Sequence, residues 1–188
     1  PSSDNVSSFT ITGGTFNAAS TTLFNGTDIS NTYDVVSTAT FENVTSARDS
    51  GRTLTITSGD TMVVTGTLTL TDGAFNTGTI NAQGNVTVAS TWDGGTSPLI
   101  FSGSAIQTFN LTGATGNHNA DITINKTGGE VDLLSALVLD AASQDLIIQE
   151  GTIDLNGSNL TVNGSSGTLV VQDGGNLQLQ GGETITAN

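Results

Sequence analysis

The stretch GTIDLNGSNLTVNGSSGTLVVQDGGNLQLQGG, residues 151–182, repeats one short pattern. Each copy is an apolar–polar–apolar triplet, and Gly, Asn, Ser or Asp separates it from the next copy. Because successive side chains of a strand point to opposite faces, each triplet predicts a short strand with one inward and one outward row. The strands begin seven to nine residues apart, at 153, 160, 169, 177 and 185, so helices cannot fit between them.

The same triplet occurs along the whole chain, at 9–11, 54–56, 68–70, 86–88, 122–124, 137–139 and 160–162. The dipeptides GG, DG, NG and SG, which are typical of turns, separate the strands. At the C-terminal end, the pattern predicts that the inward residues include Ile153, Leu155, Leu160, Val162, Leu169, Val171, Leu177 and Leu179.

The sequence also repeats with a longer period. Residues 9–29 align with residues 86–106 at an offset of about 77 residues, which places Phe16 opposite Trp92. The chain therefore divides into internal repeats at about 9–85 and 86–159 and a partial third from 160. Self-similarity at a fixed period indicates a repeat architecture.

Two all-β architectures use short strands, but an antiparallel sandwich would not normally repeat every eight residues for so long. A parallel β-solenoid (β-helix) does, with coils of about 20 to 25 residues stacked about 4.8 Å apart. We therefore expect one β-solenoid domain over residues 1–188, with about eight or nine coils. Unpaired strand edges then remain only at its two ends.

The two ends carry a prediction about partners. We find no capping segment before residue 9 or after residue 185, and the repeat that starts at 160 is unfinished. We expect copies of the chain to stack head to tail, with residues around 5–16 of one copy against residues around 177–188 of the next. Flanking parts of a longer chain are the alternative partner.

Charge and composition exclude several classes of partner. The chain has 17 acidic and three basic residues, for a net charge of −14, which disfavours nucleic acid and anionic membranes as partners. No run approaches the roughly 20 apolar residues of a membrane span. Cysteine is absent, so no thiol chemistry or disulfide arises. The chain begins at Pro1, which we interpret as a processed secreted form or a segment of a longer polypeptide.

A resemblance to known repeat proteins extends over about residues 9–186. The segments that carry it include FNGTDI, FSGSAIQTF, ITINKTGGEV and VVQDGGNLQLQGG. The chain resembles the β-solenoid repeats of large bacterial surface proteins, such as autotransporter passengers and filamentous-haemagglutinin-like adhesins. The resemblance implies an extracellular or cell-surface location. It implies little about activity, since such repeats serve as stalks, adhesins, filaments and enzyme scaffolds.

Residues able to carry catalysis are few. His118 lies in a Gly/Asn-rich connection three residues before Asp121, without a nucleophile-elbow motif, and we expect it to be solvated. Arg48, Asp49 and Arg52 could hold an acidic sugar or simply form a local ion pair, and Lys126 is isolated. We assign no catalytic and no cofactor-binding residue and expect no enzyme.

Calcium is the one cofactor that the sequence leaves open. Asp60, Asp72, Asp154 and Asp173 lie in or beside turns, and stacked turns could bring their carboxylates together, although Asp before Gly is mostly turn chemistry. We therefore name no metal ligands. Nine N-x-S/T sequons, which a chain rich in Asn, Ser and Thr produces by chance, begin at Asn5, Asn25, Asn43, Asn85, Asn110, Asn125, Asn156, Asn159 and Asn163.

The function expected from these features is that of a non-catalytic structural subunit of an extracellular fibre, stalk or adhesin. The alternative is a carbohydrate-binding or polysaccharide-cleaving β-helix, with cell-surface glycans as partners. That alternative needs exposed aromatic side chains, and Trp92 and Tyr33 are the candidates beyond phenylalanine. The alignment of Trp92 with Phe16 favours a core or coil-end position for Trp92 over a sugar platform. A flat ice-binding face is disfavoured, because the Thr triplets do not recur at one place in every coil.

Overall fold

The computed structural model describes residues 8–26, 30–35, 38–113 and 118–188. These residues form strands, turns and connections, and no helix occurs among them. The strands are β1 (Ser8–Ile11), β2 (Asn17–Gly26), β3 (Ser30–Val35), β4 (Thr38–Arg48), β5 (Thr53–Val64), β6 (Leu68–Ala82), β7 (Val86–Ala89), β8 (Trp92–Gly94), β9 (Leu99–Phe101), β10 (Gln107–Thr112), β11 (Ile122–Leu133), β12 (Leu137–Leu139), β13 (Leu146–Asp154), β14 (Leu160–Val162), β15 (Leu169–Val171), β16 (Gly175–Gln178) and β17 (Ile185–Ala187).

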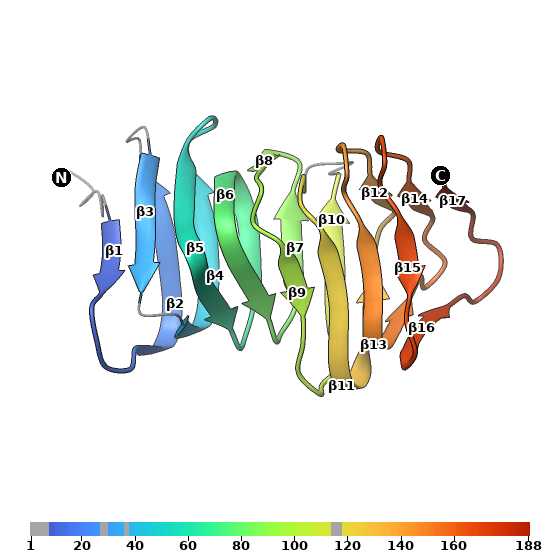
Figure 1. The fold of residues 1–188 in the computed structure, drawn as a ribbon, viewed down its shortest axis with the longest axis horizontal. Helices are drawn as coiled ribbons and strands as arrows, with labels where there is room; N and C mark the ends of the chain where they lie inside the picture. The colour runs from blue at the N-terminus through green and yellow to red at the C-terminus, as the bar shows by residue number, and fades with distance from the viewer. Residues whose placement is uncertain (1–7, 27–29, 36–37, 114–117) are drawn as a thin grey trace.

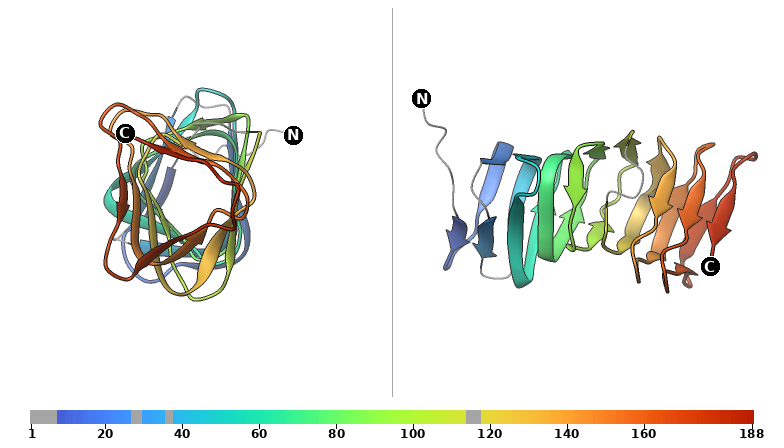
Figure 2. Two further views of the ribbon diagram at one scale, coloured as in Figure 1. Left: turned by 90° about the vertical axis from the view of Figure 1, so that its right-hand side faces the viewer. Right: turned by 90° about the horizontal axis from the view of Figure 1, so that it is seen from above.

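The strands stack as parallel rows along one axis, so the protein is a parallel β-solenoid, as the triplets predict (Figures 1 and 2). Three rows make the sides of the solenoid. Side 1 contains residues 17–18, 38–41, 61–64, 79–82, 99–101, 122–124, 146–148 and 169–171. Side 2 contains residues 21–26, 43–48, 68–72, 86–89, 107–112, 130–133, 151–154 and 175–178. Side 3 contains residues 8–11, 30–35, 53–56, 74–77 and 92–94 and, as a separate three-stranded sheet, residues 137–139, 160–162 and 185–187. Among the described residues, no strand pairing joins these two parts of side 3.

The solenoid makes about seven turns, slightly fewer than the eight or nine coils expected. Along side 1 the register advances seven times, through positions 17, 40, 63, 81, 100, 123, 147 and 170. Most steps are 23 or 24 residues, near the upper limit of the expected coil length, so fewer coils fit into the chain. The longer 77-residue period stays a prediction.

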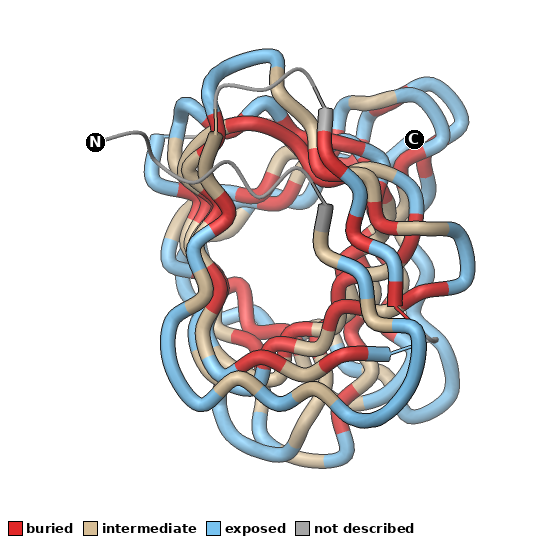
Figure 3. The backbone as a smooth tube through the Cα atoms, turned by 90° about the vertical axis from the view of Figure 1, so that its left-hand side faces the viewer, coloured by how far each residue is buried: buried red, intermediate tan, exposed pale blue. Residues whose placement is uncertain are grey.

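The interior is apolar because the first and third residues of the triplets in the middle coils are buried, and buried segments of successive coils line up along the solenoid (Figure 3). Ile153, Leu155, Leu160 and Val162 are fully buried, as predicted. Leu169 and Leu177 are partly buried against the core, whereas Val171 and Leu179 remain 49% and 47% exposed. The exposed pair lies in the inward register, one coil above Ile148 and Leu155, and no described coil covers it.

The side chains that fill the interior change from aromatic to aliphatic along the axis of the solenoid. Toward the N-terminal end, the ring of Phe9 stacks on Tyr33 at 5.5 Å and meets Phe16 edge-on at 5.0 Å between ring centroids. Phe41 then packs against Phe16 and Phe24. Toward the C-terminal end, the buried residues of β12 to β14 are Leu, Ile and Val apart from Asp154.

A second regularity lies at the entry to the strands. An Asn or Asp just before an inward residue accepts a hydrogen bond from a backbone N–H one coil later, which satisfies a group that the strand ladder leaves free. The bonds run from the N–H of Thr67 to Asn43, of Thr108 to Asn85, of Asp145 to Asp121, of Thr168 to Asp145 and of Thr184 to Asn159, at 2.7 to 3.0 Å.

Two buried glutamine side chains donate hydrogen bonds to backbone carbonyl groups at the corners of the solenoid. The side-chain amide of Gln107 donates to the carbonyl oxygens of Ala82 and Gly84, at 3.0 and 2.6 Å. Gln144 donates in the same way to the carbonyl oxygens of His118 and Ala120. Both glutamines are about 1% exposed or less, so each supplies donors where water has no access.

The difference between covered and uncovered inward positions predicts a difference in stability. Leu160→Ala should lower the free energy of unfolding by about 2 to 5 kcal/mol, because the leucine is fully buried. Leu179→Ala is the matched control, since the same truncation at a side chain 47% exposed should cost clearly less at low protein concentration. Urea unfolding followed by circular dichroism measures both. Equal costs would contradict the inward register of this end.

Candidate functional site

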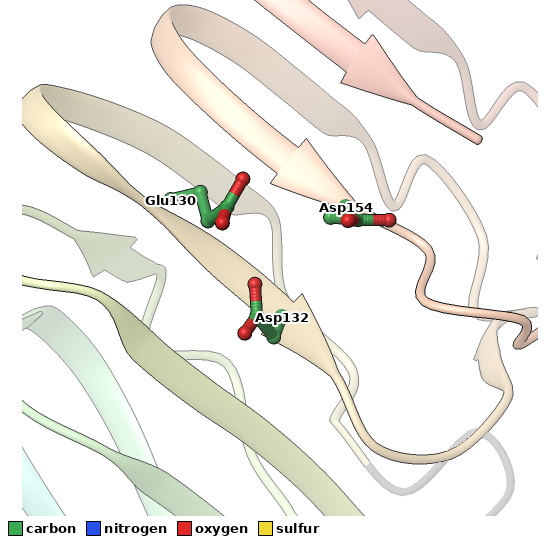
Figure 4. A group of neighbouring side chains, drawn as sticks. All are labelled: Glu130, Asp132 and Asp154. Carbon is green, nitrogen blue, oxygen red and sulfur yellow. The ribbon is translucent and has the colours of Figure 1, made fainter. Parts of the chain in front are cut away.

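Three carboxylates meet on the outer face of side 2. Glu130 and Asp132 lie two residues apart on β11, so both point outward, and Asp154 lies at the end of β13 (Figure 4). The register pairs Asp132 directly with Asp154 one coil later. One oxygen from each of the three groups lies within 4.8 Å of the others. Coil stacking therefore brings Asp154 beside Glu130 and Asp132, which lie one coil earlier in the sequence.

Asp154 is held by its neighbours on the same face. It is 5% exposed and accepts hydrogen bonds from the backbone N–H of Asn156 at 2.8 Å and from the amides of Gln178 and Gln180 at 2.8 and 3.1 Å. Burial by itself would raise the pKa of Asp154, but the three donors outweigh it, and the pKa is lowered. Asp154 is therefore an ionised, fixed carboxylate.

Asp132 has the opposite environment. Partial burial, followed by the negative charge of Asp154, raises the pKa of Asp132 above its ordinary value. Its Oδ1 atom is enclosed and has no hydrogen-bond partner. Carboxylate oxygens in this arrangement are the ligands that hard divalent cations such as Ca²⁺ prefer, so Glu130, Asp132 and Asp154 are the residues able to hold one.

Only one of the four turn aspartates considered from the sequence belongs to this cluster. Asp60 instead accepts the backbone N–H of Val35 at 2.8 Å, Asp72 accepts that of Gly73 at 2.7 Å, and Asp173 lies exposed near the C-terminal end. Glu130 and Asp132 were missed. Their alternation in GGEVDL and the 22-residue offset from Asp132 to Asp154 were the signal, but it is readable only when the coil length is known.

Two of the three basic side chains point into the solenoid and not into a surface groove. Arg48 and Lys126 are each 1% exposed, and Arg52 is partly exposed. The Lys126 ammonium group donates to the carbonyl oxygen of Ala105 at 2.8 Å and to Gln107 Oε1 at 2.5 Å, while desolvation lowers its pKa. Arg48 and Lys126 therefore belong to the interior of the solenoid.

Glycine makes room for both buried basic residues in the following coil. A Cβ atom at Gly73 would lie 2.7 Å from Cβ of Arg48, and one at Gly151 would lie 2.8 Å from Cβ of Lys126. Both glycines also have φ values, +79° and +84°, that other residues rarely adopt. The two corners thus depend on glycine for two independent reasons.

The expectation that His118 is solvated is wrong. His118 is 3% exposed, neither ring nitrogen has a hydrogen-bond partner, and burial lowers its pKa to about 4. Asp121 accepts the backbone N–H of Asp145. The side-chain amide of Gln144 donates a hydrogen bond to the carbonyl oxygen of His118.

The aromatic candidates for a carbohydrate platform are also interior. Trp92 is 2% exposed and meets Phe75 edge-on at 5.4 Å, so of the two expected positions, core or coil end, it occupies the core. Tyr33 is fully buried, and burial, with the nearby charge of Asp60, raises its pKa far above the usual value. Neither ring is available to stack on a sugar.

Several sequons follow from the coil pattern. Asn43, Asn85 and Asn159 are strand-entry residues whose side-chain oxygens accept hydrogen bonds from the next coil. The next residue in each sequon is buried, and the third is a threonine on the outer face. The N-x-T motif at these sites consists of the strand-entry asparagine, the inward residue and the outward threonine, so it has a structural origin there. Asn5 lies outside the described residues.

No protein-family model matches the chain, and neither a curated protein nor a solved structure matches it. In the described part of the chain, no helix is long and apolar enough to cross a membrane.

The acidic cluster predicts a pH-dependent effect of Asp132→Asn. Because the pKa of Asp132 is raised in the folded state, its ionisation opposes folding, and this cost appears as the pH rises through the folded pKa. Asparagine cannot ionise, so in a chelator the variant should melt at a higher temperature than the wild type at pH 7. The gain should shrink as the pH falls from the folded pKa toward the ordinary Asp pKa of 3.8, below which both states are protonated.

Asp140→Asn is the matched control, because Asp140 is exposed and lies outside the cluster. An equal gain in both variants would mean that overall negative charge, and not the contact between carboxylates, explains the effect. Melting temperatures measured again with calcium in place of the chelator test for cation binding. An ion held by the cluster would raise the melting temperature of the wild type more than that of Asp132→Asn.

Buried His118 predicts a loss of stability in mild acid. Its pKa falls from 6.5 to about 4 on folding, so the unfolded chain binds the proton first, and stability declines as the pH falls from about 6.5 to about 4. The size of the loss is roughly 3 kcal/mol. His118→Leu should remove this part of the pH dependence in urea unfolding at pH 7, 5.5 and 4. Parallel curves for both proteins would place His118 in contact with water.

Proposed function

We propose that this chain is a non-catalytic structural unit of an extracellular fibre, stalk or adhesin on a cell surface. The observation that carries the proposal is the continuity of the stacked rows. Sides 1 and 2 are each paired from coil to coil through seven consecutive steps. A protein of this build is an elongated rod (Figure 1) whose length comes from repetition.

The placement of the chemically versatile residues supports the same role. Arg48, Lys126, His118, Trp92 and Tyr33 are all buried in the solenoid. Two of them make contacts that join neighbouring coils: Lys126 donates to Gln107, and the ring of Trp92 meets that of Phe75. These side chains thus serve cohesion between coils, which is what a rod under load requires.

The outer surface supports an extracellular location. Outward positions hold Thr, Asn and Asp, and the chain has a net charge of −14 without cysteine. Such a surface stays soluble and needs no reducing compartment. The family likeness of the repeats to autotransporter passengers and filamentous-haemagglutinin-like adhesins favours the same assignment.

Surface localisation tests the proposal. Antibodies against the 188-residue chain should label intact producing cells, and protease added outside should remove the label. Cytoplasmic retention in intact cells would contradict it. Assays with pectin, alginate and β-glucans test the enzymatic alternative: we expect no turnover, and turnover that Arg52→Ala abolishes would replace the structural role with a catalytic one.

A further inference from the structure

The C-terminal coil presents an inward row that nothing described covers. Val171 and Ile185 are 49% and 37% exposed, although they lie in register with Ile148 and Leu160, which are fully buried one coil earlier. Leu179 repeats the situation above Leu155. These residues have the positions of core side chains and lack only the next coil.

The N-terminal coil presents the complementary surface. Phe9, Ile11, Phe16 and Ala18 pack on the core with one face and remain partly exposed on the other. The rings of Phe9 and Phe16 already contact Phe41 of the second coil. This end therefore offers apolar side chains in the same rows that are open at the C-terminal end.

The backbone edges at the two ends correspond side by side. Among the described residues, β15 and β16 pair only with β13 and β17 only with β14, while β1 pairs only with β3 and β2 only with β4. β15 belongs to side 1 with residues 17–18, β16 to side 2 with residues 21–26, and β17 to side 3 with β1. Each free edge thus has a parallel counterpart in the same row at the opposite end.

We propose that the C-terminal coil, residues 169–187, docks onto the N-terminal coil, residues 8–26, of a second copy of this chain. This inference rests on the proposed structural role and names its partner. The contact continues the coil-on-coil register that sides 1 and 2 repeat from β2 to β15 and β16. Because the two surfaces differ, the contact does not close and builds a filament.

Charge favours this pair of surfaces over other contacts between copies. The chain carries a net charge of −14, so most of its surfaces repel one another. Residues 8–26 contain no charged residue, and the C-terminal coil contributes only Asp173 and Glu183. The ends are therefore where two copies approach with the least repulsion, and salt should strengthen their association by screening the rest.

Sedimentation velocity of the 188-residue chain tests the proposal. The wild type should form larger species as protein concentration and NaCl rise, and electron micrographs should show filaments one solenoid wide. Val171→Asp places a charge in the uncovered inward row and should leave the protein monomeric. Val170→Asp is the matched control, because Val170 is the outward neighbour on the same strand, and it should assemble like the wild type.

A mixing experiment tests both ends together. Ile11→Asp blocks the N-terminal coil, and each blocked variant alone should be monomeric, whereas the two mixed should form dimers and nothing larger. Circular dichroism and melting curves, which the substitutions should leave near those of the wild type, verify that each variant is folded. A variant that is unfolded is replaced by Leu179→Asp or Ala18→Asp, which change an inward position at the same end.

Three results would overturn the inference. A wild type that stays monomeric at its highest soluble concentration would mean that other sequence, such as a flanking segment of a longer chain, covers the ends. Closed dimers would mean that like ends meet. Equal assembly of Val171→Asp and Val170→Asp would place the contact elsewhere. Each of these outcomes leaves the cell-surface labelling intact, so failure of stacking is distinguishable from failure of the structural role.

Discussion

Parallel pairing between successive coils is the interaction on which the rest of the structure depends. The backbone N–H and C=O groups of a strand form hydrogen bonds with the strands one coil before and one coil after it. This pairing also places equivalent side chains directly above one another. Inward residues such as Leu137 and Leu160 thereby stack into one continuous core. The same stacking places Asp132 beside Asp154 on the outer face. Core, ladders and acidic cluster are thus consequences of one register.

The corners show how this arrangement treats polar groups. A chain that turns three times per coil buries carbonyl groups where no strand ladder reaches them, and Gln107 and Gln144 donate to those groups. Arg48 and Lys126 lie at corners where the next coil carries Gly73 or Gly151. Residue types that suggest surface chemistry in a sequence are here structural parts of the interior.

The difference between the ends and the middle of the solenoid has one physical reason. A coil in the middle has neighbours on both faces, so its inward residues are dry; a terminal coil has one neighbour, so Val171 and Leu179 keep about half of their exposure. Exposed apolar residues beside free strand edges are strong sites of association. For this reason the ends, and not the three sides, carry the proposed contact between copies.

The fold could be predicted from local sequence because the triplets and turn residues act over a few positions. LTV at 160–162, ITI at 122–124 and the inward residues from Ile153 to Val162 lie as the alternation predicts. The acidic cluster and the burial of His118 could not be predicted, since each depends on which residues lie one coil apart. That offset varies from 18 to 25 residues, and a shift of one residue reverses the face that a side chain occupies. Sequence alone therefore determined the strands and their inward rows, and the tertiary structure decided which coils lie against each other and which polar groups meet, because coil length is set by turns whose geometry only packing completes.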